Sequence, residues 1–313
     1  MKSSITLVFS ACFLLMFSSC KDENKPIQNT DLQEHKTSGE KLKKAQPLSQ
    51  DFKDYWYQGE AEITSYALEQ ARYGEIRKGT AVLVYVTEPF LKSEQVKADQ
   101  ASSNSIPVLK LNATKNFNTG IYPYSIMQSV FYPAANNQHA LKVTCSVQEW
   151  CGQVYIQLNN RSDFEVRSHS YFEGEADEEF DFNKNILENE LWTQLRIDPK
   201  SLPTGNVEII PAFEFLRLRH IPFKAYNASA ELTQDRYTLS YPELNRSISI
   251  SFNPKSPFDI ISWEETFISG QGEKAKELTT KATRMKSIKS DYWNKNSNAD
   301  ASLRESLGLK QKQ

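Results

Sequence analysis

The sequence predicts a mainly β protein, an antiparallel sheet of barrel-like or sandwich-like form with one or two peripheral helices. Segments in which apolar and polar residues alternate recur about every ten residues through most of the chain. Gly, Pro and Asn residues, which favour turns, separate these segments. Stretches with the apolar spacing of an amphipathic helix are few, so the pattern does not suit alternating βαβ units.

The clearest strand pair is a hairpin over residues 141–159, LKVTCSVQEWCGQVYIQLN. Apolar residues alternate with polar ones on both arms, which gives each strand one buried face. Cys145 and Cys151 lie on either side of the turn, and the other two cysteines are in the N-terminal segment. Because an exported chain with a close cysteine pair is typical of a disulfide, we expect a Cys145–Cys151 bond worth about 2 kcal/mol. A pair of zinc ligands is the alternative.

Residues 1–19 are typical of a lipoprotein signal peptide. Lys2 precedes an apolar run that is too short to span a bilayer. The run ends in FSSC, residues 17–20, which resembles a bacterial lipobox with Phe in place of the commoner Leu. The resemblance implies that the signal is cleaved before Cys20 and that Cys20 carries acyl chains such as palmitate. An ordinary secretory signal with a chance cysteine is the alternative.

Residues 20–50 are predicted to be a disordered tether. The segment is polar and charged, and without Phe, Trp or Tyr it cannot bury enough apolar surface to fold. As a flexible coil it would span roughly 30 Å. Its first residues, CKDE, resemble the export tag of Bacteroidota lipoproteins that are displayed on the cell surface. We therefore expect an outer-membrane protein, lipid-anchored through Cys20 and facing the cell surface, with a periplasm-facing orientation as the alternative.

Residues 51–270 are predicted to form the β-rich domain. We expect its first, half-buried strand at residues 55–63. The run TAVLVYVT, residues 80–87, is nearly continuous in β-forming apolar residues, which predicts a strand buried on both faces. The acidic stretch 173–181 is expected to be a solvated loop, with a weak Ca²⁺ site as the alternative. Residues 186–195 suit a short helix.

Residues 271–293 are predicted to form an amphipathic helix packed on the sheet. Its apolar stripe recurs every three or four residues and consists of Ala275, Leu278, Ala282, Met285 and Ile288. Lysine and arginine side chains surround the stripe, so a helix at a membrane surface is the alternative. The polar residues 294–313 are expected to form a flexible tail.

Charge and motifs argue against several classes of function. The formal net charge of −2, without basic runs interleaved with aromatic residues, does not suit nucleic-acid binding. The sequence contains no HxxxH, CxxC or GxSxG motif, so we predict no metal, cofactor or catalytic residue. Paired carboxylates can hydrolyse glycans. An envelope hydrolase that uses Glu60, Glu62 or Glu149 is therefore the alternative function.

Aromatic residues are the one compositional excess, at 12% of the chain. A buried core accounts for most of them. The others are candidates for a ligand or partner surface, because Tyr and Trp combine an apolar body with a polar tip. These candidates are Tyr55, Trp56, Tyr57, Tyr122, Tyr124 and Trp150.

Four segments resemble a group of uncharacterised Bacteroidota (flavobacterial) outer-membrane lipoproteins. They are YWYQGEAEITSYALEQARYGE, AVLVYVTEPF, NFNTGIYPYSIMQSVFYP and VQEWCG, which together span about residues 55–172. Members of this group often carry the label "septum formation inhibitor Maf". Genuine Maf proteins are cytoplasmic nucleotide pyrophosphatases with a Ser-x-x-Arg-Arg-type segment near the N-terminus, where this chain has a lipoprotein signal instead. The resemblance therefore implies an envelope location and transfers no catalytic residue.

These observations together predict a non-enzymatic lipoprotein of the cell envelope. We expect it to bind an apolar or amphipathic ligand, or to dock on another envelope protein. Its attachment to the membrane would be through the lipid on Cys20.

Overall fold

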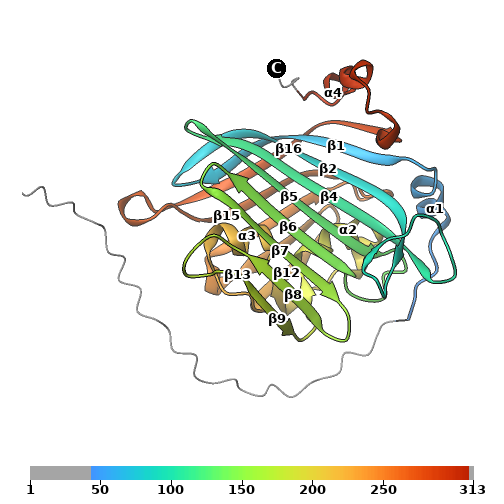
Figure 1. Cartoon of the computed structure of the whole chain (residues 1–313), viewed down its shortest axis with the longest axis horizontal. Coiled ribbons are helices and arrows are strands. Elements are labelled where there is room, and N and C mark those ends of the chain that lie inside the picture. The colour runs from blue at the N-terminus through green and yellow to red at the C-terminus, as the bar shows by residue number, and fades with distance from the viewer. Residues whose placement is uncertain (1–43, 310–313) are drawn as a thin grey trace, which may run out of the picture. The chain divides into compact units, whose positions relative to one another are not determined.

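A curled, mainly antiparallel sheet of 16 strands forms the body of the protein (Figure 1). The computed structural model describes residues 44–309. The chain divides into two units, Met1–Lys41 and Leu42–Gln313, and all described residues belong to the second. The predicted fold class, a mainly β protein with a barrel-like sheet, is confirmed. The predicted signal peptide, Cys20 and most of the tether lie outside the described residues.

The sheet follows the chain with few crossovers. Its strands pair in the order β10-β11-β12-β13-β14-β15-β16-β1-β2-β4-β5-β6-β7-β8-β9, and β3 pairs with β2. The β10–β11 pair is parallel and the others are antiparallel. The strands are β1 (Ala61–Arg72), β2 (Glu75–Leu91), β3 (Val96–Lys97), β4 (Ser105–Thr119), β5 (Tyr122–Pro133), β6 (Lys142–Glu149), β7 (Gly152–Asn160), β8 (Phe164–His169), β9 (Glu178–Phe182), β10 (Ile186–Leu187), β11 (Gly205–Ile210), β12 (Tyr226–Leu232), β13 (Arg236–Tyr241), β14 (Arg246–Phe252), β15 (Ile260–Ser269) and β16 (Lys276–Ser290).

Helices α2 (Glu188–Ile197) and α3 (Phe213–Arg219) lie between the β4–β7 strands and the strands behind them (Figure 1). The helix predicted over 186–195 is confirmed as α2 (Glu188–Ile197), whose Leu191 and Leu195 are buried in the main core. The other α-helices are α1 (Gln50–Trp56), α3 (Phe213–Arg219) and α4 (Leu303–Ser306), and the 3-10 helices are η1 (Pro199–Ser201), η2 (Pro242–Leu244), η3 (Gly272–Lys274), η4 (Tyr292–Asn294) and η5 (Asn298–Ser302). None of the helices within residues 44–309 is both long and apolar enough to cross a bilayer.

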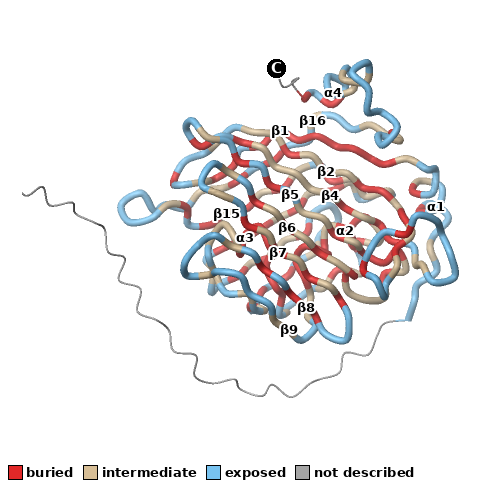
Figure 2. Tube along the Cα trace, in the orientation of Figure 1, coloured by how far each residue is buried: buried red, intermediate tan, exposed pale blue. Residues whose placement is uncertain are grey.

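Strand β2 contacts apolar residues on both faces, as its apolar run predicts, with full burial on the inner face and partial burial on the outer face. Ala81, Leu83 and Tyr85 face the main core on the concave side. The alternate residues Val82, Val84 and Val86 belong to a second cluster on the outer side. Figure 2 shows the resulting buried stretches along β1 and β2. The outer face of a sheet is normally solvated, so something must cover these valines.

The chain beyond residue 294 supplies this cover. Leu307 and Leu309 are buried against the outer cluster, with Ile63 and Val86 beneath them. The Ser65 hydroxyl donates a hydrogen bond to the backbone carbonyl of Leu307, which fixes the segment to β1. The tail that we expected to be free therefore packs on the sheet up to residue 309, because its two leucines have an apolar surface to bury.

The helix predicted over 271–293 is wrong. After η3, this stretch forms β16, a central strand paired with both β15 and β1. The pairing has a register shift opposite Ser65 and Tyr66. Ala282 faces the main core, whereas Met285 and Ile288 pack in the outer cluster, so the helix-like spacing arises from one strand that contributes to two cores. Three β-branched threonines between 279 and 283 also favour a strand.

Aromatic side chains join the two ends of the sheet. Strands β9 and β10 are its terminal strands, and the described residues contain no hydrogen-bonded pairing between them. Instead, the rings of Phe180 and Phe182 on β9 lie 5.4 and 5.5 Å from that of Phe223, which precedes β12. Phe223 also contacts Phe213 of α3 at 5.6 Å. The curled sheet therefore closes through an edge-to-face aromatic cluster.

The predicted disulfide is absent, and both cysteines are free thiols. The hairpin itself forms as β6 and β7, with Cys145 opposite Ile156 and Glu149 opposite Gly152. Cys145 faces the core, whereas Cys151 is exposed at the turn. Glu149 lies four residue steps along the strand from Cys145, a rise of about 13 Å, whereas the α-carbons of a disulfide lie about 6 Å apart. Cysteines that flank a tight turn at unequal distances do not face each other.

Candidate functional site

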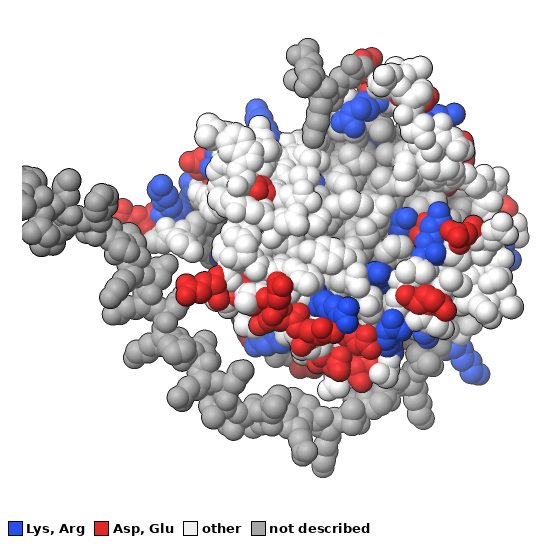
Figure 3. Space-filling view, viewed as in Figure 1, with Lys and Arg blue, Asp and Glu red and all other residues white. Residues whose placement is uncertain are grey.

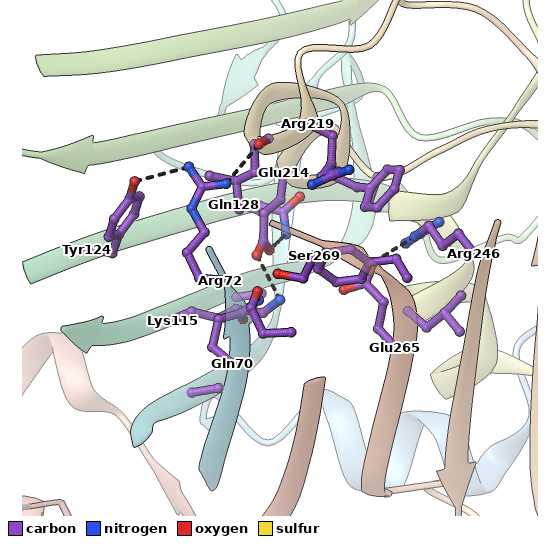
Figure 4. Close-up of a pocket in the computed structure, with 18 of the residues that line it drawn as sticks. Gln70, Arg72, Lys115, Tyr124, Gln128, Glu214, Arg219, Arg246, Glu265 and Ser269 are labelled. Atoms are coloured by element: carbon purple, nitrogen blue, oxygen red, sulfur yellow. Dashed lines mark hydrogen bonds and ion pairs between the residues drawn. The ribbon is translucent and has the colours of Figure 1, made fainter. Parts of the chain in front are cut away.

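A cavity of about 640 Å³ lies inside the curled sheet. Its walls come from the inward faces of β1, β2, β4, β5, β14 and β15 and from α2 and α3 (Figure 4). Because side chains alternate between the two faces of a strand, most of the wall comes from alternate residues, such as Leu111, Ala113 and Lys115 on β4. The volume lies within the range of about 300 to 1,000 Å³ that is typical of small-molecule sites.

The inner part of the cavity is apolar. Its lining includes Leu83, Leu111, Val130, Ile248 and Trp263 from five different strands. Trp192 of α2 also lines it and packs edge-on against Trp263, with ring centroids 5.3 Å apart. This region can accept an apolar group of a ligand, since such contacts remove apolar surface from water.

A first group of buried charges surrounds Arg246. The Arg246 guanidinium donates to both carboxylate oxygens of Glu188 at 2.5 and 2.6 Å, and its Nε donates to Glu265 at 2.7 Å. Arg246 is 4% exposed. Burial by itself would lower the pKa of Arg246, but the two carboxylates raise it well above its ordinary value. The positive charge of Arg246 is therefore fully compensated within the protein.

A second group links β4, β5, α2 and α3 through hydrogen bonds. Lys115 Nζ lies 2.8 Å from Glu214 Oε1, and Gln128 donates to the other oxygen of Glu214 at 3.0 Å. Asn189 donates to Gln128 and accepts from the backbone N–H of Phe213. Burial would lower the pKa of Lys115, but Glu214 raises it above its ordinary value. This group is neutral overall and holds α3 against the sheet.

Arg72 at the end of β1 differs from these cations. Its guanidinium donates to the carbonyl of Leu218 at 2.8 Å and to the hydroxyls of Tyr73 and Tyr124 at 3.1 Å each. Its Nε is buried and has no partner among the described residues. Nearby in the wall, Gln70 is 2% exposed and its Oε1 also lacks a partner within residues 44–309. This part of the cavity wall therefore contains a buried donor and a buried acceptor whose hydrogen-bonding capacity the described residues leave unused.

The cavity opens at the end of the sheet where four hairpin turns meet. The register places the β1–β2, β4–β5, β6–β7 and β15–β16 connections at this same end, which we call the mouth. Tyr73 and Gly74, both with positive φ, form the β1–β2 turn, as expected for a two-residue hairpin loop. The exposed lining residues, such as Cys151, His220 and Lys274, all lie at the mouth.

Three of the predicted aromatic residues lie near the mouth. Tyr124 is buried in the cavity wall and stacks on Phe117 at 5.0 Å. The ring of Tyr122 lies 6.0 Å from Tyr124 and 6.4 Å from Trp150, which is 68% exposed on the β6–β7 turn. Of the six candidates, Tyr124 lines the cavity, and Tyr122 and Trp150 form part of its surroundings.

The other three predicted aromatic residues lie at the opposite end of the sheet. Residues 55–57 do not form a strand, because the sequence from Ser49 begins with a side-chain cap and folds as α1. Trp56 is buried against Tyr85, and the Tyr55 hydroxyl donates to Glu62 at 2.5 Å. The six aromatic candidates therefore do not form one continuous surface.

The predicted carboxylates are not paired with one another. Glu62 is buried and accepts two hydrogen bonds of 2.7 Å from Arg196. Glu149 lies at the mouth, where it accepts from the Cys151 N–H at 2.8 Å and from the Tyr171 hydroxyl at 2.9 Å. Glu60 precedes β1, at the same end as Glu62. Within residues 44–309, no group of three or more His, Cys, Asp or Glu residues is arranged to hold a metal ion.

Sequence reasoning missed the charged residues of the cavity. The sequence of β1 contains a pattern that could have revealed some of these residues. Its inward-facing positions alternate and are occupied by Tyr66, Leu68, Gln70 and Arg72. A charged residue that continues the buried series of a strand must either be paired or line a cavity. Lys115 continues such a series on β4 in the same way.

Comparisons with known proteins show weak similarity to solved structures. No protein-family model matches the chain, and no curated protein matches it. The beta-barrel-like protein of domain of unknown function DUF1849 from Brucella abortus has 7% sequence identity and a TM-score of 0.43, over 73% of this chain and 96% of that chain. A porin-like protein from Bacteroides uniformis has 10% identity and a TM-score of 0.21, over 72% and 96%. Neither likeness supports an inference about function.

Proposed function

We propose that the protein is a non-enzymatic binding module for an amphipathic small molecule. The observation that carries this proposal is the cavity, which combines an apolar interior with polar groups near its mouth. The apolar part of the ligand would lie against Leu83, Leu111 and Trp192. Its polar part would lie near Arg72, within reach of solvent. A cavity in which apolar side chains lie beside fixed polar and charged groups suits reversible binding of an amphipathic small molecule.

Glycan hydrolysis is less well supported by the same geometry. A pair of catalytic carboxylates needs one free nucleophile or base and one acid with a raised pKa. The cavity carboxylates Glu188, Glu214 and Glu265 are each bonded to a cation. Glu62 and Glu149 lie at opposite ends of the sheet. We therefore favour binding over hydrolysis.

We also propose that the module is a lipoprotein of the outer membrane that faces the cell surface. This proposal depends on the lipobox at Cys20 and on the CKDE tag in the sequence. Helix α1 begins at Gln50, at the end of the predicted tether. Globomycin, which blocks lipoprotein signal cleavage, should cause an uncleaved form to accumulate in cells. Cleavage that is insensitive to globomycin would argue against the anchor.

Cavity binding can be tested with a neutral apolar fluorophore, N-phenyl-1-naphthylamine, on the unit Leu42–Gln313. The Ala113→Trp variant places an indole in the cavity, because Ala113 lines it. The matched control is Ala67→Trp, since Ala67 is exposed on β1. We expect wild type and Ala67→Trp to bind the fluorophore and Ala113→Trp to bind at least about tenfold more weakly. Equal binding by all three proteins would show that the cavity is not the binding site.

A further inference from the structure

Two arginines at the mouth side of the cavity have no bonded carboxylate. Arg72 donates to the Leu218 carbonyl and to two tyrosine hydroxyls, all of which are neutral. Arg219, at the end of α3, lies 5.6 Å from the ring centre of Phe267 and forms no salt bridge within the described part of the chain. Figure 4 shows both side chains on the same side of the pocket, above Lys115 in this view.

The charges inside the cavity do not cancel. Lys115 and Arg246 are bonded to three carboxylates, those of Glu188, Glu214 and Glu265. Adding Arg72 and Arg219 makes four cations against three carboxylates. At the rim, the lining adds one charge of each sign, Lys274 and Glu149, so one positive charge remains in excess. The Glu149 carboxylate accepts hydrogen bonds from Cys151 and Tyr171. Burial alone would raise the pKa of Glu149, but these hydrogen bonds and then the charge of Arg72 lower it below its ordinary value.

The two guanidinium groups also repel each other. Burial, and then the charge of Arg72, lower the pKa of Arg219 below its ordinary value, and Glu265 offsets part of this effect. Two like charges in a partly desolvated site are unfavourable unless an anion lies between them or beside them. A planar guanidinium with free N–H groups matches a carboxylate or a phosphate in geometry as well as charge.

We propose that Arg72 and Arg219 bind the headgroup of the cavity ligand, and that this headgroup is an anion, a carboxylate or a phosphate. This proposal rests on the binding function proposed above and specifies the class of ligand. The Tyr73 and Tyr124 hydroxyls hold the Arg72 guanidinium in place without neutralising its charge. The chain of the ligand would extend from this point toward Leu111 and Trp192.

Ligands with one chain and different headgroups test this assignment. Dodecanoate, dodecyl phosphate, dodecanol and dodecyltrimethylammonium would be titrated into the unit Leu42–Gln313, below their critical micelle concentrations, by displacement of N-phenyl-1-naphthylamine. We expect both anions to bind at least about tenfold more tightly than dodecanol, and the cation to bind more weakly than dodecanol. The tighter of the two anions identifies whether carboxylate or phosphate is preferred.

Arginine variants then test whether Arg72 and Arg219 cause the preference for anionic headgroups. Arg72→Gln and Arg219→Gln should each lower the affinity for the anions by about tenfold and leave that for dodecanol unchanged. Arg72→Lys keeps the positive charge but lacks the planar guanidinium group. It should therefore lose less affinity for the anions than Arg72→Gln. The matched control is Arg236→Gln, because Arg236 is exposed at the start of β13 and does not line the cavity. If Arg72→Gln does not fold, Arg219→Gln alone decides.

The outcomes separate the two proposals. If dodecanol binds as tightly as the anions, the headgroup assignment is wrong and the cavity proposal stands. Preference for the trimethylammonium ligand would also overturn the assignment. If none of the four ligands displaces the fluorophore, and the fluorophore itself does not bind, both proposals fail. Anion binding that neither arginine variant weakens would place the headgroup elsewhere.

Discussion

The buried pair of Arg196 and Glu62 allows a quantitative test of the structure. Arg196 is 1% exposed and Glu62 2%, and two parallel hydrogen bonds of 2.7 Å join them. The guanidinium carbon of Arg196 also lies 4.9 Å from the Trp56 ring and 4.7 Å from the Tyr85 ring. Arg196→Met would remove the charge and keep much of the volume. Glu62 would then be a buried carboxylate without its main partner.

We expect this variant to lose about 3 to 5 kcal/mol of unfolding free energy at neutral pH, the usual cost of leaving one member of a buried ion pair uncompensated. That loss is a large fraction of the roughly 5 to 15 kcal/mol that stabilises a typical domain. Replacing both partners, in Glu62→Leu/Arg196→Met, should recover most of it, because no charge is then left buried. The exposed pair of Arg161 and Glu165 provides a control, and Arg161→Met should cost no more than about 1 kcal/mol.

The loss should also depend on pH with a definite sign. Burial alone would raise the pKa of Glu62, but Arg196 lowers it below its ordinary value in the folded protein. The pair therefore stabilises the wild type above the unfolded pKa of about 4.3, and this contribution falls as the pH drops below that value. In Arg196→Met, burial should raise the pKa of Glu62, so protonation relieves the buried charge. The difference between the two proteins should shrink as the pH falls from 7 toward 5.

Urea unfolding of the unit Leu42–Gln313, followed by tryptophan fluorescence at pH 7 and pH 5, measures both effects. A loss below about 1 kcal/mol at pH 7 would contradict the uncompensated-charge argument. A loss of the same size at both pH values would contradict the proposed ionisation of Glu62. A double variant no more stable than Arg196→Met would show that packing, and not charge, is the cause.

Two further predictions concern features that differ from the sequence-based expectations. Leu307→Ala should lower the free energy of unfolding by about 2 to 3 kcal/mol, because Leu307 is buried on the outer face of the sheet. Thermal unfolding measures this loss. An unchanged melting temperature would mean that the segment does not pack there. Cys151 should react with a thiol reagent in the folded protein and Cys145 only after unfolding, because burial shields Cys145 and raises the pKa of its thiol. An intact mass lower by two hydrogens would instead reveal a disulfide.

The fold class could be predicted because strand alternation is a local property of the sequence. The same property explains the error at residues 276–290. Ala282 and Met285 face different cores, and sequence spacing alone does not show that an outer core exists. The apolar run at residues 80–87 did indicate an outer core, since apolar residues on both faces of β2 must be covered on each side. The cover comes from Leu307, more than 200 residues away in the sequence.

The site was harder to predict because its residues are scattered. Arg72, Lys115, Arg219 and Arg246 come from three strands and a helix, and only the folded register brings them to one cavity. Composition pointed to a set of aromatic residues, and one of them, Tyr124, lines the cavity. It could not separate them from Trp56, which has the same chemistry but lies in the core. Arg246 is bonded to two carboxylates and Arg72 only to neutral groups, and this difference is a property of the folded structure.

The aromatic closure of the sheet has a consequence for solubility. A sheet that closes without a final row of hydrogen bonds keeps two terminal strands, and such strands can pair with another molecule and start aggregation. Here β10 has two residues, too few to recruit a partner strand. Strand β9 carries Glu178, Glu179 and Asp181, and acidic side chains gather over β8 and β9 in Figure 3. If β9 of a second molecule approached, the acidic side chains of the two strands would repel each other. This repulsion would disfavour edge-to-edge pairing of two copies of the protein.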